Sequence, residues 1–153
     1  MEIRKARIED IDRIAELLHQ VNDVHADGRS DLFIHGKRKY NDTELVDIIT
    51  NEKMLIYVAV EEFVLGYAFC IIEESKGENL HPMKSLFIDD LCVDENIRSK
   101  GIGTALYKHV VNEAKKLECN RITLNVWCLN ESAMKFYQKM GLQPLKIVME
   151  ERV

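Results

Sequence analysis

The segment Leu91-Cys92-Val93-Asp94-Glu95-Asn96-Ile97-Arg98-Ser99-Lys100-Gly101-Ile102-Gly103 joins an apolar strand, a polar turn and the start of a long helix. Its two glycines, one residue apart, allow backbone N–H groups to approach a ligand because no Cβ stands in the way. The N-terminus of the following helix adds about half a positive charge to those donors. The segment therefore predicts an anion site suited to a pyrophosphate.

Arg98 and Lys100 lie in the same turn and can add charge-assisted contacts to an anion. The glycine pair alone does not distinguish an anion site from an ordinary turn before a helix. Two nucleotide-binding motifs are absent. Position 106 is leucine, so the third glycine of a dinucleotide fingerprint is missing, and no Gly-Lys-Ser/Thr follows as in a Walker loop.

The rest of the chain alternates between patterns typical of strands and of helices. We expect strands at Glu2–Ala6, Met54–Glu61, Val64–Glu74, Ser85–Val93, Arg121–Trp127 and Leu145–Met149. Helices are expected over the apolar positions from Ile8 to Val21, from Asn41 onward, and at Gly101–Leu117 and Asn130–Met140, whereas Asn22 to Tyr40 is irregular. The order β-α-α-β-β-β-α-β-α-β predicts an α/β fold with a mixed central sheet flanked by helices.

Length and composition predict one soluble domain over residues 1–153, with 46% hydrophobic and 31% charged residues. Twenty-one Lys and Arg against 26 Asp and Glu give a net charge of −5, which argues against nucleic-acid binding. The only basic run, Lys37-Arg38-Lys39, is too short for such a footprint and is interpreted as part of a loop.

No membrane span, signal peptide or metal site is expected. The longest apolar run, Met54 to Val60, is far shorter than the roughly 18 residues that a span requires, and the N-terminus has no apolar signal core. Four cysteines without a CxxC pair and five histidines without His-x-x-x-His spacing give little support to a metal site. We therefore expect a cytoplasmic protein with free thiols.

A second segment, Asn130-Glu131-Ser132-Ala133-Met134-Lys135-Phe136-Tyr137-Gln138-Lys139-Met140-Gly141-Leu142, forms a capped helix that ends in glycine. Together the two segments resemble the GCN5-related N-acetyltransferase (GNAT) superfamily. They match its patterns Arg/Gln-x-x-Gly-x-Gly/Ala and Asn-x-x-Ala-x-x-Phe-Tyr-x-x-x-Gly-Phe, in the right order. The departures are Ser99 and Lys100 for a frequent glycine, Asp94-Glu95 for a frequent Asp-Pro, and Leu142 for phenylalanine.

The resemblance implies a mostly antiparallel sheet splayed at its middle strands, the acyl-CoA N-acyltransferase fold, with acetyl-CoA as cosubstrate and no metal. The pyrophosphate would be held by the backbone amides of Arg98, Ser99, Lys100, Gly101, Ile102, Gly103 and Thr104. The pantetheine arm would pair with the strand edge at Leu91, Cys92 and Val93, and Asn130 would form a hydrogen bond with that arm. Tyr137 would be the general acid that protonates the departing thiolate.

An amine acceptor is nucleophilic only as the free base, which costs roughly 4–5 kcal/mol at neutral pH for an alkylammonium. A base or a desolvating pocket must therefore assist. Asp89 and Asp90 interrupt an apolar strand, and neighbouring strand residues face opposite sides. The resemblance assigns Asp89 as base or amine anchor, while a structural hydrogen bond in a bulge is equally open for Asp90.

The function expected first is transfer of acetyl from acetyl-CoA to a primary amine of a small molecule, directly in a ternary complex. Acetylation of a protein or peptide amine and a non-catalytic acyl-CoA-binding sensor remain as alternatives. In this superfamily the segment Asn22 to Tyr40 would roof the acceptor site. A homodimer is also left open, with Leu145 to Met149 as a paired edge.

Overall fold

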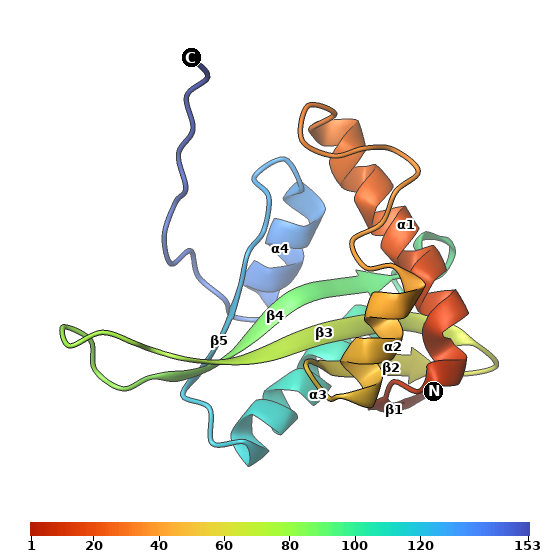
Figure 1. Ribbon diagram of the computed structural model, residues 1–153, viewed down its shortest axis with the longest axis horizontal. Helices are drawn as coiled ribbons and strands as arrows, with labels where there is room; N and C mark the ends of the chain where they lie inside the picture. The colour runs from red at the N-terminus through yellow and green to blue at the C-terminus, as the bar shows by residue number, and fades with distance from the viewer.

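The computed structural model describes all residues 1–153 and contains one sheet of five strands in the order β1-β2-β3-β4-β5 (Figure 1). The strands are β1 (Glu2–Lys5), β2 (Leu55–Val60), β3 (Val64–Glu74), β4 (Lys84–Val93) and β5 (Arg121–Leu124). The first three pairings are antiparallel, and β4 and β5 are parallel. The predicted mixed, mostly antiparallel sheet is therefore confirmed.

Helices cover both faces of the sheet, as Figure 1 shows. They are α1 (Ile11–Gly28), α2 (Asp42–Thr50), α3 (Ile102–Lys116) and α4 (Glu131–Lys139), with short 3-10 turns η1 (Ile8–Asp10) and η2 (Glu95–Ile97). α1 and α2 pack on one face and α3 on the other, while α4 follows β5.

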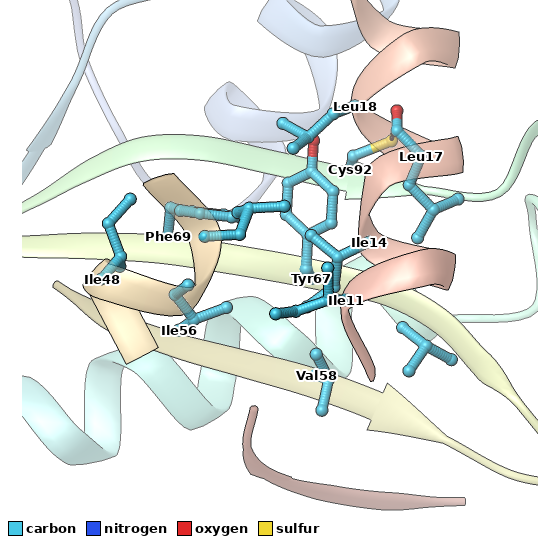
Figure 2. Packing of buried hydrophobic residues seen from close by; sticks show 12 residues of the cluster. Ile11, Ile14, Leu17, Leu18, Ile48, Ile56, Val58, Tyr67, Phe69 and Cys92 are labelled. Atoms are coloured by element: carbon cyan, nitrogen blue, oxygen red, sulfur yellow. Dashed lines mark hydrogen bonds between the residues drawn. The ribbon is translucent and has the colours of Figure 1, made fainter. Parts of the chain in front are cut away.

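Strand alternation divides the core into two clusters. On the face of α1 and α2, Tyr67 and Phe69 of β3 pack with Ile14 and Leu18 (Figure 2). On the opposite face Ala68 and Cys70 pack against α3.

A bulge in β4 reverses this alternation partway along the strand. Phe69 pairs with Asp90 and Cys70 with Ile88, so Asp89 has no partner of its own. Before the bulge, Ile88 packs on the α3 face, whereas after it Cys92 packs on the α1 face. One inserted residue inverts the side-chain parity of everything that follows it. The bulge therefore decides which way the candidate site residues of β4 point.

The second predicted helix begins as expected. The Asn41 side chain accepts a hydrogen bond from the Glu44 backbone N–H at 2.8 Å, and the Glu44 carboxylate accepts one from the Asn41 N–H at 3.2 Å. This reciprocal capping box fixes the start of α2 and, with it, the end of the preceding loop.

Three expectations differ from the structure. α1 continues to Gly28, into the segment expected to be irregular, because Ala26 extends its buried face. β5 ends at Leu124 instead of Trp127. The predicted last strand, Leu145–Met149, is wrong: residues 143–153, here called the C-terminal arm, form no backbone hydrogen bond. Their apolar side chains find no surface of this chain to pack on, so no sheet edge holds them.

Candidate active site

The sheet opens between β4 and β5. Their parallel pairing runs from Ser85 opposite Arg121 to Ile88 opposite Leu124 and then stops, because β5 ends there. β4 continues to Val93 and remains paired with β3 on its other side. Its second edge is consequently free along residues 89–93, where an extended ligand can add as a strand does. This opening is the splay that the sequence resemblance implied.

Beyond that edge, the backbone N–H groups of residues 98–104 donate no hydrogen bond within the protein. The first bond of α3 runs from the Ala105 N–H to the Gly101 carbonyl at 2.9 Å. The donors before it point out of the helix N-terminus, where the helix dipole favours negative charge. The residues predicted to hold a pyrophosphate thus present a continuous row of unpaired donors.

The turn itself depends on left-handed backbone conformations. Gly101 has a φ of 76°, and a Cβ placed there would meet no atom within 4 Å. Ser99 has a φ of 69°, a region that non-glycine residues rarely adopt. Ser99 is the position where the resembled family often carries glycine, and its φ supplies the physical reason for that preference.

Side chains of α1 anchor the loop that precedes α3. Asp94 is buried and forms an ion pair with Arg13 of α1. It also accepts a hydrogen bond from the Asn96 N–H at 2.9 Å, which caps η2. Burial alone would raise the pKa of Asp94. The Asn96 N–H and the Arg13 guanidinium together outweigh burial and lower the pKa below its ordinary value, so that the carboxylate stays ionised. The Gln20 side chain also accepts a hydrogen bond from the Glu95 N–H at 3.2 Å.

Two basic side chains lie beside the row of free donors. Arg98 and Lys100 are both exposed, and neither forms an ion pair within the protein. The Arg98 Nε donates to the Val93 carbonyl at 3.4 Å, which places this side chain along the free edge of β4. Both charges are available to an anionic ligand.

Asp89 projects from the bulge toward the segment between α1 and α2. Both of its carboxylate oxygens lie 2.8 Å from Nζ of Lys39, and Oδ2 also accepts a hydrogen bond from the Tyr40 hydroxyl at 2.8 Å. The ring of Tyr40 stacks on Phe69 with centroids 5.5 Å apart. Asp89 is 12% exposed as a side chain, so it is nearly enclosed yet fully paired.

Asp90 faces the same side of the sheet, contrary to the expectation that neighbouring strand residues diverge. Its Oδ2 accepts a hydrogen bond at 2.7 Å from the hydroxyl of Tyr67, which packs edge-to-face on Phe69. The bulge turns both carboxylates toward one aromatic group. Burial raises the pKa of Asp90 to about 6, although Tyr67 and the ammonium of Lys39 oppose the rise.

Tyr137 of α4 lies close enough to Asp90 and Cys92 of β4 for both to influence its hydroxyl. Burial raises the pKa of its hydroxyl well above the ordinary value, and the nearby Asp90 and Cys92 contribute to the rise. The phenol is therefore fully protonated at neutral pH. Cys92 turns its thiol away, toward the Leu17 carbonyl at 3.7 Å in the core (Figure 2). Burial raises the pKa of that thiol to about 12.

Asn130 is the N-cap of α4. Its side-chain oxygen accepts hydrogen bonds from the Ala133 N–H and the Ser132 hydroxyl, both at 3.2 Å. Its amide NH2 group makes no hydrogen bond within the protein, so only that group can serve a ligand. Asn130 can thus cap the helix that carries Tyr137 and also offer an N–H donor to a ligand.

An aromatic wall connects α1 to the segment after β5. Phe33 lies 5.0 Å from the ring of His25 and 5.4 Å from that of Trp127. Close by, a Cβ on Gly28 would meet Leu129 at 2.6 Å, so glycine allows the end of α1 to approach this segment. The sequence had singled out neither Phe33 nor Trp127, and Lys39 and Tyr40 were also missed. Their contacts join residues that are distant in the chain, and no local pattern marks them.

A hollow of about 610 Å³ lies elsewhere, between α3, β5 and the start of the C-terminal arm. Its lining is partly apolar and includes Tyr107, Val111, Ile122, Met140 and Leu142. No group of three or more His, Cys, Asp or Glu side chains is arranged to hold a metal ion. None of the helices combines the length and apolarity needed to cross a membrane.

Comparison with solved structures places the fold among acetyltransferases. The chain superposes on a tetramutant of the BH1408 protein from Bacillus halodurans with a TM-score of 0.94, 29% identity and full coverage of both chains. An aminoglycoside N-acetyltransferase in complex with CoA matches in fold, with a TM-score of 0.72, 15% identity, and coverage of 99% of this chain and 98% of that one.

Curated relatives match about two thirds of the chain. The probable N-acetyltransferase san of Drosophila melanogaster is 29% identical over 68% of this chain and 54% of its own length. N-alpha-acetyltransferase 50 of Danio rerio is 30% identical over 68% of this chain and 60% of its own. The matches thus span little more than half the length of these relatives. The model of the Acetyltransferase (GNAT) family matches residues 14–142, from α1 past the end of α4. The chain therefore belongs to the GNAT acetyltransferase family.

Proposed function

We propose that residues 1–153 form a single catalytic domain that transfers acetyl from acetyl-CoA directly to a primary amine of a small molecule. The observation that carries this proposal is the row of unpaired N–H donors at residues 98–104, which leads onto the free edge of β4. An anionic pyrophosphate followed by an extended thioester arm fits donors of that kind in that order.

On the donor side, the amides of residues 98–104 would bind the pyrophosphate. The backbone of Leu91, Cys92 and Val93 would pair with the pantetheine arm, and the amide of Asn130 would donate to it. Arg98 and Lys100 supply positive charge locally, which an acidic protein with a net charge of −5 otherwise lacks. The CoA complex of the aminoglycoside enzyme, which shares this fold, supports the choice of donor.

On the acceptor side, Asp89 would anchor the ammonium of the amine and take its proton. The carboxylate already holds a lysine ammonium at 2.8 Å, which supports a primary alkylammonium as its partner. The His25, Phe33 and Trp127 wall would enclose the carbon chain of the acceptor. Deprotonation of an ordinary alkylammonium costs roughly 4–5 kcal/mol at neutral pH, and the base has to offset this cost.

Tyr137 would complete the transfer as the general acid. The developing thiolate needs a proton, and the raised pKa of Tyr137 keeps its hydroxyl protonated at neutral pH until transfer. Transfer through Cys92 is disfavoured, because its thiol faces the core and its pKa is about 12. This supports attack by the amine on acetyl-CoA within a ternary complex.

The N-terminal amine of a protein or peptide is the second candidate acceptor. The similarity to N-alpha-acetyltransferase 50 of Danio rerio favours it. A sensor that binds acyl-CoA without turnover is the third candidate. We propose the cytoplasm as the compartment, since the thiols of Cys70 and Cys92 are buried and unpaired.

One assay separates these functions. The protein is incubated with acetyl-CoA and either small primary amines or short peptides with free N-termini, and released CoA thiol is measured. Turnover on small amines supports the proposal, and turnover on peptides alone assigns the second candidate. Thermal stabilisation by acetyl-CoA without turnover on any amine indicates a sensor, and the absence of stabilisation contradicts the donor site.

We also propose that the protein forms a homodimer by exchange of C-terminal arms. In the arm, Leu145, Ile147 and Met149 alternate with other residues and are at least two-thirds exposed. β5 is the last strand of the sheet and has an open edge beside the partly apolar hollow. The chain's own arm leads away from that hollow, since Glu150 pairs with Arg29 at 2.5 Å. The arm of a second copy can supply the missing strand.

A further inference from the structure

Lys39 occupies the position that an acceptor amine would take. Its Nζ lies 2.8 Å from both oxygens of Asp89, in the bulge beside the free edge of β4. The other lysine ion pairs lie elsewhere: Lys5 with Glu52, Lys53 with Asp47, and Lys116 with Glu113. Lys39 is the one lysine whose ammonium contacts a carboxylate of the candidate site.

The position of Lys39 is fixed by its neighbours in the chain. Tyr40 stacks on the buried ring of Phe69 and donates to the same Asp89, and Asn41 caps α2. Arg38 is engaged with Asp42 at 2.6 Å, so it does not compete for Asp89. The Lys39 side chain is nevertheless 52% exposed, which leaves room for an acyl group on Nζ. An accessible amine held next to the strand edge that would bind the thioester arm would gain rate from proximity.

We propose that Lys39 is itself an acceptor, and that the protein acetylates Nζ of Lys39 with its own acetyl-CoA. This inference rests on the proposed function, because it uses the same donor site and the same carboxylate. The ammonium is already bound to the carboxylate that would take its proton.

The step balances with acetyl-CoA as the only co-reactant. Nζ loses one proton to Asp89, which passes it to water, and the free amine attacks the thioester carbonyl. The C–N bond forms, the second proton of Nζ passes to water, and the tetrahedral intermediate collapses as the C–S bond breaks. The thiolate takes a proton from Tyr137, water returns a proton to the phenolate, and CoA leaves as the thiol, so that one proton is released in total. The product amide carries no charge, so Asp89 is released from its ion pair.

The test is intact-mass and peptide-mapping mass spectrometry of the purified protein incubated with acetyl-CoA, with CoA as the blank. We expect one added acetyl group at Lys39, formed at least about tenfold faster than at the exposed Lys37 of the same loop, because only Lys39 is held by a carboxylate. Lys37→Arg should keep this modification. Lys39→Arg, which retains the charge and the ion pair, should abolish it, as should Asp89→Asn.

Thermal stabilisation by acetyl-CoA and turnover on the amine panel are measured on the same samples. Turnover on external amines with Lys39 unmodified, or modified no faster than Lys37, overturns this inference and leaves the proposed function intact. Absence of both stabilisation and turnover overturns both. Acetylation of Lys39 at a rate per molecule that does not change with protein concentration supports transfer within one chain.

Discussion

Gly103 lies in the first turn of α3, within the row of free N–H donors. A Cβ built there would be 3.5 Å from Phe136 and 3.6 Å from Val93, which are ordinary contact distances. Gly103→Glu should therefore fold, and a carboxylate near a helix N-terminus suits the dipole. The same carboxylate would repel a pyrophosphate. We expect unchanged or higher thermal stability without ligand, and loss of the stabilisation by acetyl-CoA, measured by thermal unfolding.

Gly103→Ala is the matched control. It adds the Cβ without the charge and gains helix propensity of up to about 1 kcal/mol. Acetyl-CoA should still stabilise it. Full stabilisation of the glutamate variant by acetyl-CoA would mean that the pyrophosphate binds elsewhere.

Asp90 gives the stability of the protein a specific pH dependence. Its pKa is raised from 3.8 to about 6 by burial, so the folded state holds a proton that the unfolded state releases. Stability therefore falls as pH rises from about 4 to about 6 and levels off above that. Measured against Asp90→Asn, which can still accept from Tyr67, the wild type should lose roughly 2 kcal/mol between pH 4 and pH 7.

The measurement is urea unfolding of both proteins at several pH values, with the difference in free energy of unfolding plotted against pH. Glu16→Gln, on an exposed carboxylate away from Asp90, is the control and should change the free energy of unfolding by no more than about 0.5 kcal/mol. A flat difference for Asp90→Asn would contradict the raised pKa.

At this scale, sequence reasoning could propose the residues that a local motif marks, but it did not identify those that only the fold brings together. The loop at residues 98–104 and Tyr137 were each proposed from the spacing within a single segment. Lys39, in contrast, reaches Asp89 across 50 positions of the chain. Even the direction of Asp90 required the structure, because a bulge reverses strand parity and leaves no clear signature in one sequence.

At the scale of elements, strands with two buried faces and helices with a marked apolar stripe were predicted closely. β3 has the predicted bounds, and α3 and α4 each differ from prediction by a residue at either end. The errors lie where partners decide the outcome. The arm has the composition of a strand, but strand formation requires pairing with an edge, and the arm makes no backbone hydrogen bond to the open edge of β5.

The ion pair between Arg13 of α1 and Asp94 connects α1 to the loop before α3. Arg13 pairs with two carboxylates, Asp94, whose side chain is 6% exposed, and Glu16, whose side chain is 62% exposed. Asp94→Asn leaves the guanidinium without its buried partner, and we expect a loss of roughly 2 kcal/mol in the free energy of unfolding. The loop at residues 95–101 should also loosen, so that acetyl-CoA stabilises this variant less than the wild type.

Glu16→Gln removes the other partner of the same arginine. Because that ion pair is exposed, the change should stay within about 0.5 kcal/mol and leave acetyl-CoA binding unaltered. Urea unfolding and ligand-dependent thermal shift check both variants. Equal effects of the two substitutions would show that the Asp94 pair does not hold the loop.

At the scale of the whole molecule, the site is assembled from four separate parts of the chain. α1 with the loop after it, β4, the start of α3 and α4 each contribute (Figure 1). The sequence predicted the part that would bind acetyl-CoA, since β4 and α3 are consecutive in the chain. It left the acceptor half open, because that half depends on how the loop after α1 packs against β4 and on Trp127, which lies beyond β5.

The C-terminal arm is expected to hold two copies of the protein together. Its apolar side chains are exposed in the single chain and contribute little free energy there. Burial in a partner's groove is worth roughly 2 kcal/mol for each large side chain, and a symmetric exchange buries the side chains of two arms. The ion pairs that hold the arm, Glu150 with Arg29 and Arg152 with Asp31, are exposed and weak. We therefore expect a dimer in sedimentation velocity, and a monomer for Ile147→Lys, which leaves the fold intact because Ile147 is 76% exposed. Lys146→Gln, on the opposite side of the arm, should remain dimeric, and a wild-type protein that sediments as a monomer would rule out the exchange.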